Sequence, residues 1–190
     1  MPLTDPGPIE SARLLLRLVE ERDLPALRAV NGDDEVTRFL PYATWLTLGD
    51  ARAWYERMHR LQAAGLALQF VVVEKSSGQP IGTCLLFRFE EGSARAELGY
   101  VLGRAHWGRG CMREALGALI ACAFGPMALR RLEAEVDARN ASSGRLLLQL
   151  GFEKEGLLRQ RWVSDGQARD VEIYGLLRHE TGCAKRCDAA

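Results

Sequence analysis

The middle of the chain holds a strand, a short loop and a helix that begins on two glycines, set among segments typical of β-hairpins. Alternating apolar residues predict a strand over 94–102, and a continuous apolar face predicts a helix over 110–124. Gly108-Arg109-Gly110 joins them. A helix start presents free backbone N–H groups and the positive end of the helix dipole, and glycines let an anion approach closely. This step therefore predicts a phosphate or pyrophosphate site.

The other segments predict one α+β (mixed α/β) domain in which antiparallel hairpins surround this central step. We expect residues 1–10 to form a flexible lead-in, 11–178 a single domain and 179–190 a disordered tail. Hydrophobic periodicity and turn residues predict strands at 13–18, 68–74, 80–89, 132–136, 152–163 and 171–177, and helices after Asp23, at 48–64 and at 141–150.

Charge and cysteine usage limit the class of protein. Lys plus Arg and Asp plus Glu number 25 each, so the net charge of zero gives no global attraction to nucleic acid or to an anionic membrane. No apolar run approaches the roughly 20 residues of a membrane helix, and residues 1–10 lack the features of a secretory signal. Cys183 and Cys187 have no second pair of ligands beside them. Five irregularly spaced cysteines and three isolated histidines predict a reduced, cytoplasmic protein without a metal centre.

A second strand-to-helix junction carries polar residues between Val136 and Ser143. Asn140 and Ser143 lie at the predicted helix start, where both residue types are ordinary caps. Two interpretations stay open: they cap the helix only, or they cap it and also face the cleft beside the glycine loop. The chain has no P-loop Gly-Lys-Ser/Thr and no complete G-x-G-x-x-G, so nucleotide hydrolysis and hydride transfer lose support.

Four segments together resemble the GNAT superfamily of N-acetyltransferases, and within it the ribosomal-protein N-terminal (alanine/serine) acetyltransferases. The resemblance runs over residues 11–177. It implies a GNAT fold, in which a central, mostly antiparallel sheet is splayed at the acetyl-CoA site and flanked by helices. It also implies acetyl-CoA as the donor and direct attack of a primary amine on the thioester. The segments are Arg13-Leu-Leu-Leu-Arg17, Glu97-Leu-Gly-Tyr-Val101, Trp107-Gly-Arg-Gly-Cys-Met-Arg-Glu-Ala115, and Asn140-Ala-Ser-Ser143 with Gly151-Phe152 through Gly156.

Matched positions imply roles for individual residues. The backbone at 100–102 binds the pantetheine arm together with Asn140, and the amides at 108–112 bind the pyrophosphate. Ser143 is implied to protonate the departing thiolate. The implied cofactor-binding residues are Tyr100, Val101, Leu102, Trp107, Gly108, Arg109, Gly110, Cys111, Met112 and Asn140.

Two positions depart from the family pattern. Ala105 stands where the superfamily often has Gln or Arg, with little consequence because the site binds through backbone N–H groups. Arg161 stands where the ribosomal-protein enzymes carry a Glu on the strand after Gly156, and an arginine cannot act as the base.

An amine attacks only when it is neutral, so some group must accept its proton. Strand alternation puts Glu97 on one face with Gly99 and Val101, beside the implied pantetheine site, which makes Glu97 the candidate base. The alternative has equal weight: Glu97 is structural, either solvated or paired with an arginine such as Arg95 or Arg161.

Other residues have weaker claims to a chemical role. Asp170 and Glu172 are reserves that we expect to bind a cationic amine or to pair with Arg159. His106 is expected to be a loop residue. The segment 35–54, with its aromatic side chains, is expected to wall the acceptor side.

The leading hypothesis is an acetyl-CoA-dependent N-acetyltransferase acting on a protein N-terminal α-amine or a small-molecule amine. The rival hypothesis is a non-catalytic acyl-CoA-binding or sensing module of the same fold, against which Glu97 and Ser143 argue mildly. We expect no nucleic-acid and no membrane partner, and a homodimer is left open.

Overall fold

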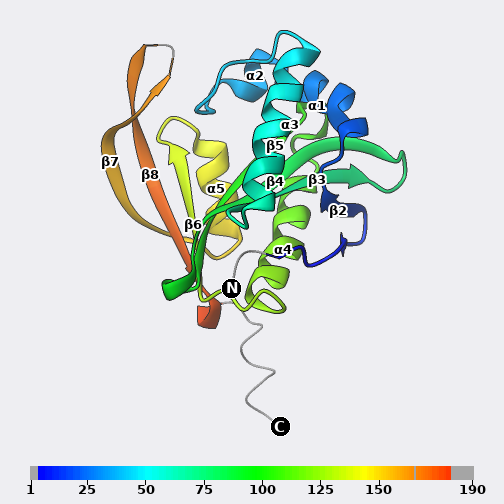
Figure 1. Ribbon diagram of the computed structural model, residues 1–190. Helices are drawn as coiled ribbons and strands as arrows, with labels where there is room; N and C mark the ends of the chain where they lie inside the picture. The colour runs from blue at the N-terminus through cyan, green and yellow to red at the C-terminus, as the bar shows by residue number, and fades with distance from the viewer. Residues whose placement is uncertain (1–3, 165, 181–190) are drawn as a thin grey trace.

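The computed structural model describes residues 4–164 and 166–180, which form one sheet with helices on both faces (Figure 1). The eight strands follow the order β1-β2-β3-β4-β5-β6-β8-β7. Only β5 and β6 are parallel, which confirms the predicted α+β class with a mostly antiparallel sheet. The strands are β1 (Ile9–Glu10), β2 (Leu14–Leu18), β3 (Ala67–Glu74), β4 (Gln79–Glu90), β5 (Arg95–Leu102), β6 (Arg131–Asp137), β7 (Glu153–Ser164) and β8 (Gln167–Leu177); the α-helices are α1 (Leu24–Asn31), α2 (Asp34–Thr37), α3 (Leu48–Ala63), α4 (Cys111–Phe124) and α5 (Ala141–Gln149).

The parallel pair is short, and the sheet opens where it ends. β5 pairs with β6 only from Arg95 to Glu97, which lies opposite Glu133. Beyond this point β5 stays paired with β4 as far as Leu102, whereas β6 stays paired with β8 as far as Asp137. Figure 1 shows β6, β7 and β8 curving away from the half of the sheet that contains β2 to β5. The implied splay of the central sheet therefore begins at Glu97.

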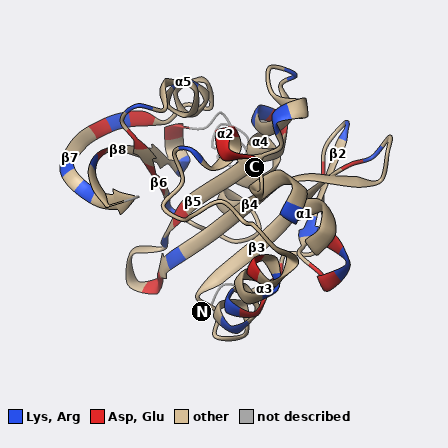
Figure 2. Ribbon diagram, turned by 90° about the horizontal axis from the view of Figure 1, so that it is seen from above, with Lys and Arg blue, Asp and Glu red and all other residues tan. Residues whose placement is uncertain are grey.

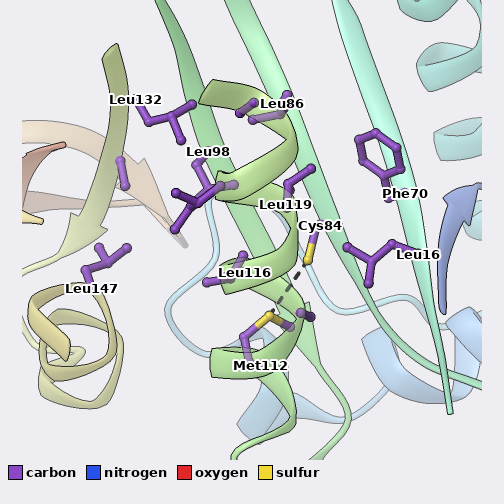
Figure 3. Packing of buried hydrophobic residues seen from close by; sticks show 14 of the residues in the cluster. Leu16, Phe70, Cys84, Leu86, Leu98, Met112, Leu116, Leu119, Leu132 and Leu147 are labelled. Atoms are coloured by element: carbon purple, nitrogen blue, oxygen red, sulfur yellow. Dashed lines mark hydrogen bonds between the residues drawn. The ribbon is translucent and has the colours of Figure 1, made fainter. Parts of the chain in front are cut away.

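Helices α4 and α5 cover one face of the sheet around this opening. Leu98 of β5 and Leu132 of β6 lie in the same buried cluster as Leu116 and Leu119 of α4, with Leu147 of α5 at its side (Figure 3). Each fully buried leucine contributes about 1.5–3 kcal/mol to the free energy of folding. The core therefore holds α4 across the strands and fixes where its first turn lies.

Helices α1 and α3 cover the opposite face through a second cluster that includes Leu27, Val71 and Trp45. Trp54 packs against this cluster with its ring centroid 5.2 Å from that of Trp45. Tyr42 packs there too, so these aromatic side chains belong to the core. The expectation that the aromatics of 35–54 wall an acceptor pocket is therefore wrong for Trp45, which is buried.

The chain is held to the sheet before residue 11, where the domain was predicted to begin. Ile9 and Glu10 form β1 and pair with Leu16 and Leu15 of β2. At the other end, 178–180 form a 3-10 turn. Residues 181–190 of the predicted tail, with Cys183 and Cys187, lie outside the described residues. No helix within 4–164 or 166–180 is long and apolar enough to cross a bilayer.

Gly82 of β4 permits a close approach to β5, and this approach generates a stability prediction. A Cβ atom at Gly82 would lie 2.3 Å from the carbonyl oxygen of Val101. We expect Gly82→Ala to lower the free energy of unfolding by about 2 kcal/mol, because the two strands must separate to admit the methyl group. Urea unfolding measures this change.

Gly92→Ala is the matched control, since a Cβ atom there meets nothing within 4 Å. It should change the free energy of unfolding by less than about 0.5 kcal/mol. Equal stability of the two variants would contradict the close contact at Gly82.

Candidate active site

The loop before α4 forms an open hollow lined by backbone. Gly108 and Gly110 have φ of +70° and +74°, a left-handed conformation that favours glycine. A Cβ atom at Gly108 would meet nothing within 4 Å, and at Gly110 the nearest atom would be Nη2 of Arg13, 3.7 Å away. No side chain caps the helix at Gly110. The free N–H groups of the first turn therefore face a space that an anion can enter.

Two side chains of this segment are turned into the core, and a third lies near an acid on β3. Cys111 and Met112 are buried in the core, where the sulfur of Met112 lies 3.8 Å from that of Cys84 (Figure 3). Nη2 of Arg109 lies 3.6 Å from a carboxylate oxygen of Glu74. Cys111 and Met112 can therefore offer a ligand only their backbone N–H groups.

Arg13 braces the same helix start, a role that sequence reasoning missed. Its Nε donates to Glu114 Oε2 at 2.6 Å, its backbone N–H donates to Glu114 Oε1 at 2.7 Å, and its Nη1 donates to the carbonyl of Arg109 at 3.1 Å. Burial tends to raise the pKa of Glu114, but hydrogen bonds from Arg13 and Ser11 outweigh it and hold that pKa below its ordinary value. Arg13 thereby balances the negative charge of Glu114 in the first turn of α4. The one signal in the sequence is Glu114 itself. An acid next to a predicted anion site requires a cation to balance its charge, and that cation is Arg13.

The predicted pantetheine residues lie on the edge of β5 that faces the opening. From residue 98 onward this edge pairs with no other strand in the described part of the chain. The carbonyl of Leu102 already accepts a hydrogen bond of 2.8 Å from the indole nitrogen of Trp107. Because the Val101 carbonyl faces Gly82 on β4, alternation along β5 leaves the backbone of Tyr100 on the open edge, where an extended ligand can pair with it as a strand would.

On the α5 side, hydroxyl groups bridge the opening. The hydroxyl of Tyr100 shares a hydrogen bond of 2.6 Å with that of Ser143, in the first turn of α5. Asn140 accepts a 3.1 Å hydrogen bond from the backbone of Ser143, which confirms it as the helix cap. Burial raises the pKa of Tyr100 to about 12, so its phenol stays protonated at neutral pH.

On the opposite face of the sheet, charged groups bridge the opening. Glu97 is only 8% exposed, and its carboxylate accepts a 2.7 Å hydrogen bond from Nη1 of Arg88 on β4. The same nitrogen lies 3.1 Å from Oε1 of Glu135 on β6. Glu97 thus pairs with an arginine, as the structural alternative expected, but the partner is Arg88. The partners named for it differ, because Arg95 pairs with Glu90 and Glu133, and Arg161 pairs with Glu135.

The environment of Glu97 raises the pKa of its carboxyl group above the ordinary value. Burial raises the pKa of Glu97, the hydrogen bond and charge of Arg88 oppose this, and the neighbouring Glu135 and Glu133 raise the pKa further. The net direction is upward. A carboxylate with a raised pKa accepts a proton more readily near neutral pH, which is the property that a general base needs.

The reserve acids are both engaged elsewhere. Glu172 accepts from Lys154 at 2.5 Å and from the hydroxyl of Tyr174 at 2.7 Å, and its pKa is lowered, first by the hydrogen bond from Lys154. Asp170 accepts from the backbone N–H of Gln160 at 2.8 Å. These contacts replace the expected partner, Arg159.

Glu135 is an acid that sequence reasoning missed. Besides Arg88, it is contacted by Nη2 of Arg161 at 3.3 Å and by the indole nitrogen of Trp162 at 2.9 Å. In Figure 2 acidic and basic residues alternate at the start of β7, and the charged residues further along the strand are arginines. Within the described ranges, no three His, Cys, Asp or Glu side chains are grouped to hold a metal ion.

Comparisons with known proteins place this geometry in a family. A family model described as an acetyltransferase (GNAT) domain matches residues 13–153. The chain belongs to the GNAT acetyltransferases. The predicted family and the likeness to its ribosomal-protein branch are both confirmed.

Relatives and solved structures agree with this family. The chain is 37% identical over 168 residues to the uncharacterized N-acetyltransferase p20 of Bacillus licheniformis, which covers 88% of this chain and 94% of the relative. It is 33% identical over 173 residues to the ribosomal protein uS5-alanine N-acetyltransferase of Escherichia coli, covering 86% and 87%. The structure of RimL, a ribosomal alpha-N-protein acetyltransferase in complex with coenzyme A, matches with a TM-score of 0.82 at 22% identity, covering 90% and 98%. The protein is an N-acetyltransferase.

The brace between Arg13 and Glu114 generates a pH prediction. Because the pKa of Glu114 is lowered in the folded state, the brace stabilises the fold above the ordinary carboxyl pKa of 4.5. This contribution is lost as pH falls through the lower, folded-state pKa. We expect Arg13→Gln to lower the melting temperature at pH 7, and the gap to the native protein to close toward pH 3.

Arg22→Gln is the matched control, because Arg22 is 70% exposed and pairs only with exposed Glu20. It should leave the melting temperature nearly unchanged across this range, as for most surface ion pairs. A gap for Arg13→Gln that persists undiminished at pH 3 would show that the brace does not depend on the Glu114 charge.

Proposed function

We propose that this protein transfers the acetyl group of acetyl-CoA directly to a primary amine. The observation that carries the proposal is the opening between β5 and β6, with Glu97 at its root and the hydroxyls of Tyr100 and Ser143 across its other face. A thioester held in this opening has a carboxylate on one side and hydroxyl donors on the other. These are the groups that amine acetylation needs.

The donor would bind along two continuous features. Backbone N–H groups of residues 108–112 would hold the pyrophosphate at the start of α4, where Gly108 and Gly110 leave space. The pantetheine arm would lie along the edge of β5 at residues 100–102, with the amide nitrogen of Asn140 available because only its oxygen caps α5. The related fold of RimL was solved with coenzyme A, which supports this assignment.

The chemistry would proceed in one direct transfer. Glu97 accepts a proton from the amine, whose lone pair then attacks the carbonyl carbon of the thioester. The new C–N bond forms as the C–S bond breaks, and the sulfur leaves as a thiolate. The Ser143 hydroxyl, held by Tyr100, donates a proton to that thiolate, and water returns to Ser143 the second proton, which the acetylated nitrogen loses.

The acceptor is a protein N-terminal α-amine or a small-molecule amine. The 33% identity to an enzyme named for alanine of ribosomal protein uS5 supports the α-amine. Arg161 stands at the position where the ribosomal-protein enzymes carry a Glu, and it contacts Glu135. The charge on the acceptor side of this protein therefore differs from that of those enzymes.

Turnover tests the proposal against a module that only binds acyl-CoA. Release of free thiol from acetyl-CoA is followed with a panel of α-amino peptides, polyamines and amino acids. We expect amine-dependent thiol release with at least one class. Tight binding of CoA without thiol release for any amine would favour the binding module.

Gly110 generates a prediction about the donor. Gly110→Glu should abolish CoA binding, because a carboxylate would enter the hollow and repel the pyrophosphate. For the native protein, CoA at about 100 times its dissociation constant should add roughly 2.7 kcal/mol to the free energy of unfolding. The readout is the rise in melting temperature with CoA.

Gly166→Glu is the control for this variant. Gly166 also has a left-handed φ, +70°, but lies in the turn between β7 and β8, so it suffers the same backbone strain away from the hollow. The control should keep the CoA-dependent shift. A preserved shift in Gly110→Glu would place the pyrophosphate elsewhere.

Glu97 generates a prediction about the proton. Glu97→Gln keeps the shape but removes the base, so turnover should fall about 10²- to 10⁴-fold while CoA affinity stays the same. The ascending limb of the rate-versus-pH curve should disappear or move toward the pKa of the amine. Ser143→Ala should lose less activity, because water can protonate the thiolate.

Glu133→Gln is the matched control on the facing strand, since Glu133 lies opposite Glu97 in the parallel pair and binds Arg95 and Arg131. It should retain most of the turnover. Nearly full activity of Glu97→Gln across the pH range would make Glu97 structural.

A further inference from the structure

Arg88 joins two carboxylates that belong to opposite halves of the divided sheet. Its Nη1 atom lies 2.7 Å from Oε2 of Glu97 on β5 and 3.1 Å from Oε1 of Glu135 on β6. Glu135 lies two residues beyond Glu133, the last β6 residue paired with β5. One cationic nitrogen therefore sits across the root of the opening, on the face opposite the Tyr100–Ser143 hydrogen bond.

A local irregularity of β4 turns Arg88 toward these acids. Phe87 lies directly opposite Glu97, so a regular strand would send Arg88 to the other face. The register instead shifts between Phe87 and Glu90, and Arg88 takes a left-handed φ of +49°. Residues other than glycine rarely adopt this conformation, and such strain gathers at functional sites. The bulge therefore serves to place a cation between Glu97 and Glu135.

The side chains of the two acids are largely buried, whereas the cation is half-exposed and lies over the ring of Phe87, 5.4 Å from its centroid. The side chains of Glu97 and Glu135 are each 10% exposed, but that of Arg88 is 54% exposed. Glu135 is also held by Arg161 and Trp162 on β7. A half-exposed guanidinium on a long side chain can move into water, while the two carboxylates stay in place.

We propose that Arg88 occupies the subsite of the acceptor's ammonium group, and that the acceptor binds between Glu97 and Glu135 by displacing it. This inference rests on the proposed function and deepens it. A primary ammonium has three N–H donors on one nitrogen, so it can reproduce both contacts that Nη1 of Arg88 makes. A quaternary ammonium has none. The acceptor class is therefore a primary amine that arrives protonated.

The exchange changes what the site can do with a proton. The guanidinium of Arg88 stays charged and cannot release a proton at neutral pH. The ammonium that replaces it carries the same charge but can pass one proton to Glu97, which leaves the amine lone pair free to attack the thioester. Arg88 thus satisfies the two buried acids in the free enzyme and withdraws when a reactive cation arrives.

Binding of a bare ammonium tests the subsite without catalysis. Propylammonium is titrated calorimetrically into the native protein, into Arg88→Ala and into Arg88→Ala/Glu135→Gln, all without acetyl-CoA. We expect at least tenfold tighter binding to Arg88→Ala than to the native protein, and loss of that gain in the double variant. Unchanged or weaker binding to Arg88→Ala overturns the proposal.

Kinetics provides a second and independent readout. With the best amine of the panel, Arg88→Gln should lower the KM for the amine severalfold and leave the KM for acetyl-CoA unchanged. Arg95→Gln is the matched control, because Arg95 also bridges two glutamates, Glu90 and Glu133, on the neighbouring strand. It should change neither constant. A raised amine KM in Arg88→Gln would mean that Arg88 binds the acceptor, and would overturn the displacement.

The two tests separate failure of this inference from failure of the proposed function. Tighter propylammonium binding to Arg88→Ala without turnover of any amine would support the ammonium subsite and refute the proposed acetyl transfer to a primary amine. Turnover with unchanged amine KM in Arg88→Gln would support the transferase and refute the subsite. A crystal structure of the native protein with propylammonium resolves the case in which the variants fold poorly, because an ammonium nitrogen between the carboxylates requires Arg88 to have moved.

Discussion

The end of strand pairing at Glu97 is the constraint on which the rest of the site depends. β5 keeps its hydrogen bonds to β4 and β6 keeps its hydrogen bonds to β8, so the two halves of the sheet diverge while each remains a sound antiparallel unit. Buried backbone groups need partners, and the open edges can obtain them from an extended ligand. Side chains bridge the opening on each face: Arg88 reaches Glu97 and Glu135 on one, and Tyr100 meets Ser143 on the other. The site is thus a break in strand pairing, and the strands on its two sides, β5 and β6, are held in place by β4 and β8.

The position of α4 follows from the same division. Its apolar face packs across the strands through leucines such as Leu116 and Leu119, and this packing fixes where its first turn lies. The anion site proposed at that turn depends on a distant part of the chain, because Arg13 pairs with Glu114 and lies beside Gly110. The pairing with Arg13 balances the charge of Glu114, so the free N–H groups at the start of α4 have no unpaired acid of the first turn beside them.

Local patterns in the sequence predicted much of this structure. Residue periodicity and turn residues act over a few positions, and they predict the glycine pair, the helix that follows it and the hairpins. The partner of Glu97 was not predictable in this way. Alternation along a regular strand would put Arg88 on the face opposite Glu97. Only the bulge after Phe87 turns Arg88 to the same face as Glu97. The contact of Arg13 with Glu114 joins residues 101 apart, and that of Arg88 with Glu135 joins residues 47 apart, so neither leaves a local signal.

The acids at the opening are poorly explained by stability alone. Removing two carboxylates from water is costly, and ion pairs in such surroundings often stabilise a fold no more than apolar residues would. Here the arrangement also carries the strain of a left-handed Arg88. A structural requirement would be met more simply by apolar residues like those on the α4 face of the same strands. Burial and the neighbouring acids raise the pKa of Glu97 against the opposing effect of Arg88, so its affinity for a proton depends on which cation is present. A buried acid with a raised pKa, paired with a half-exposed cation where the sheet divides, supports the proposal that Glu97 accepts the proton of the amine.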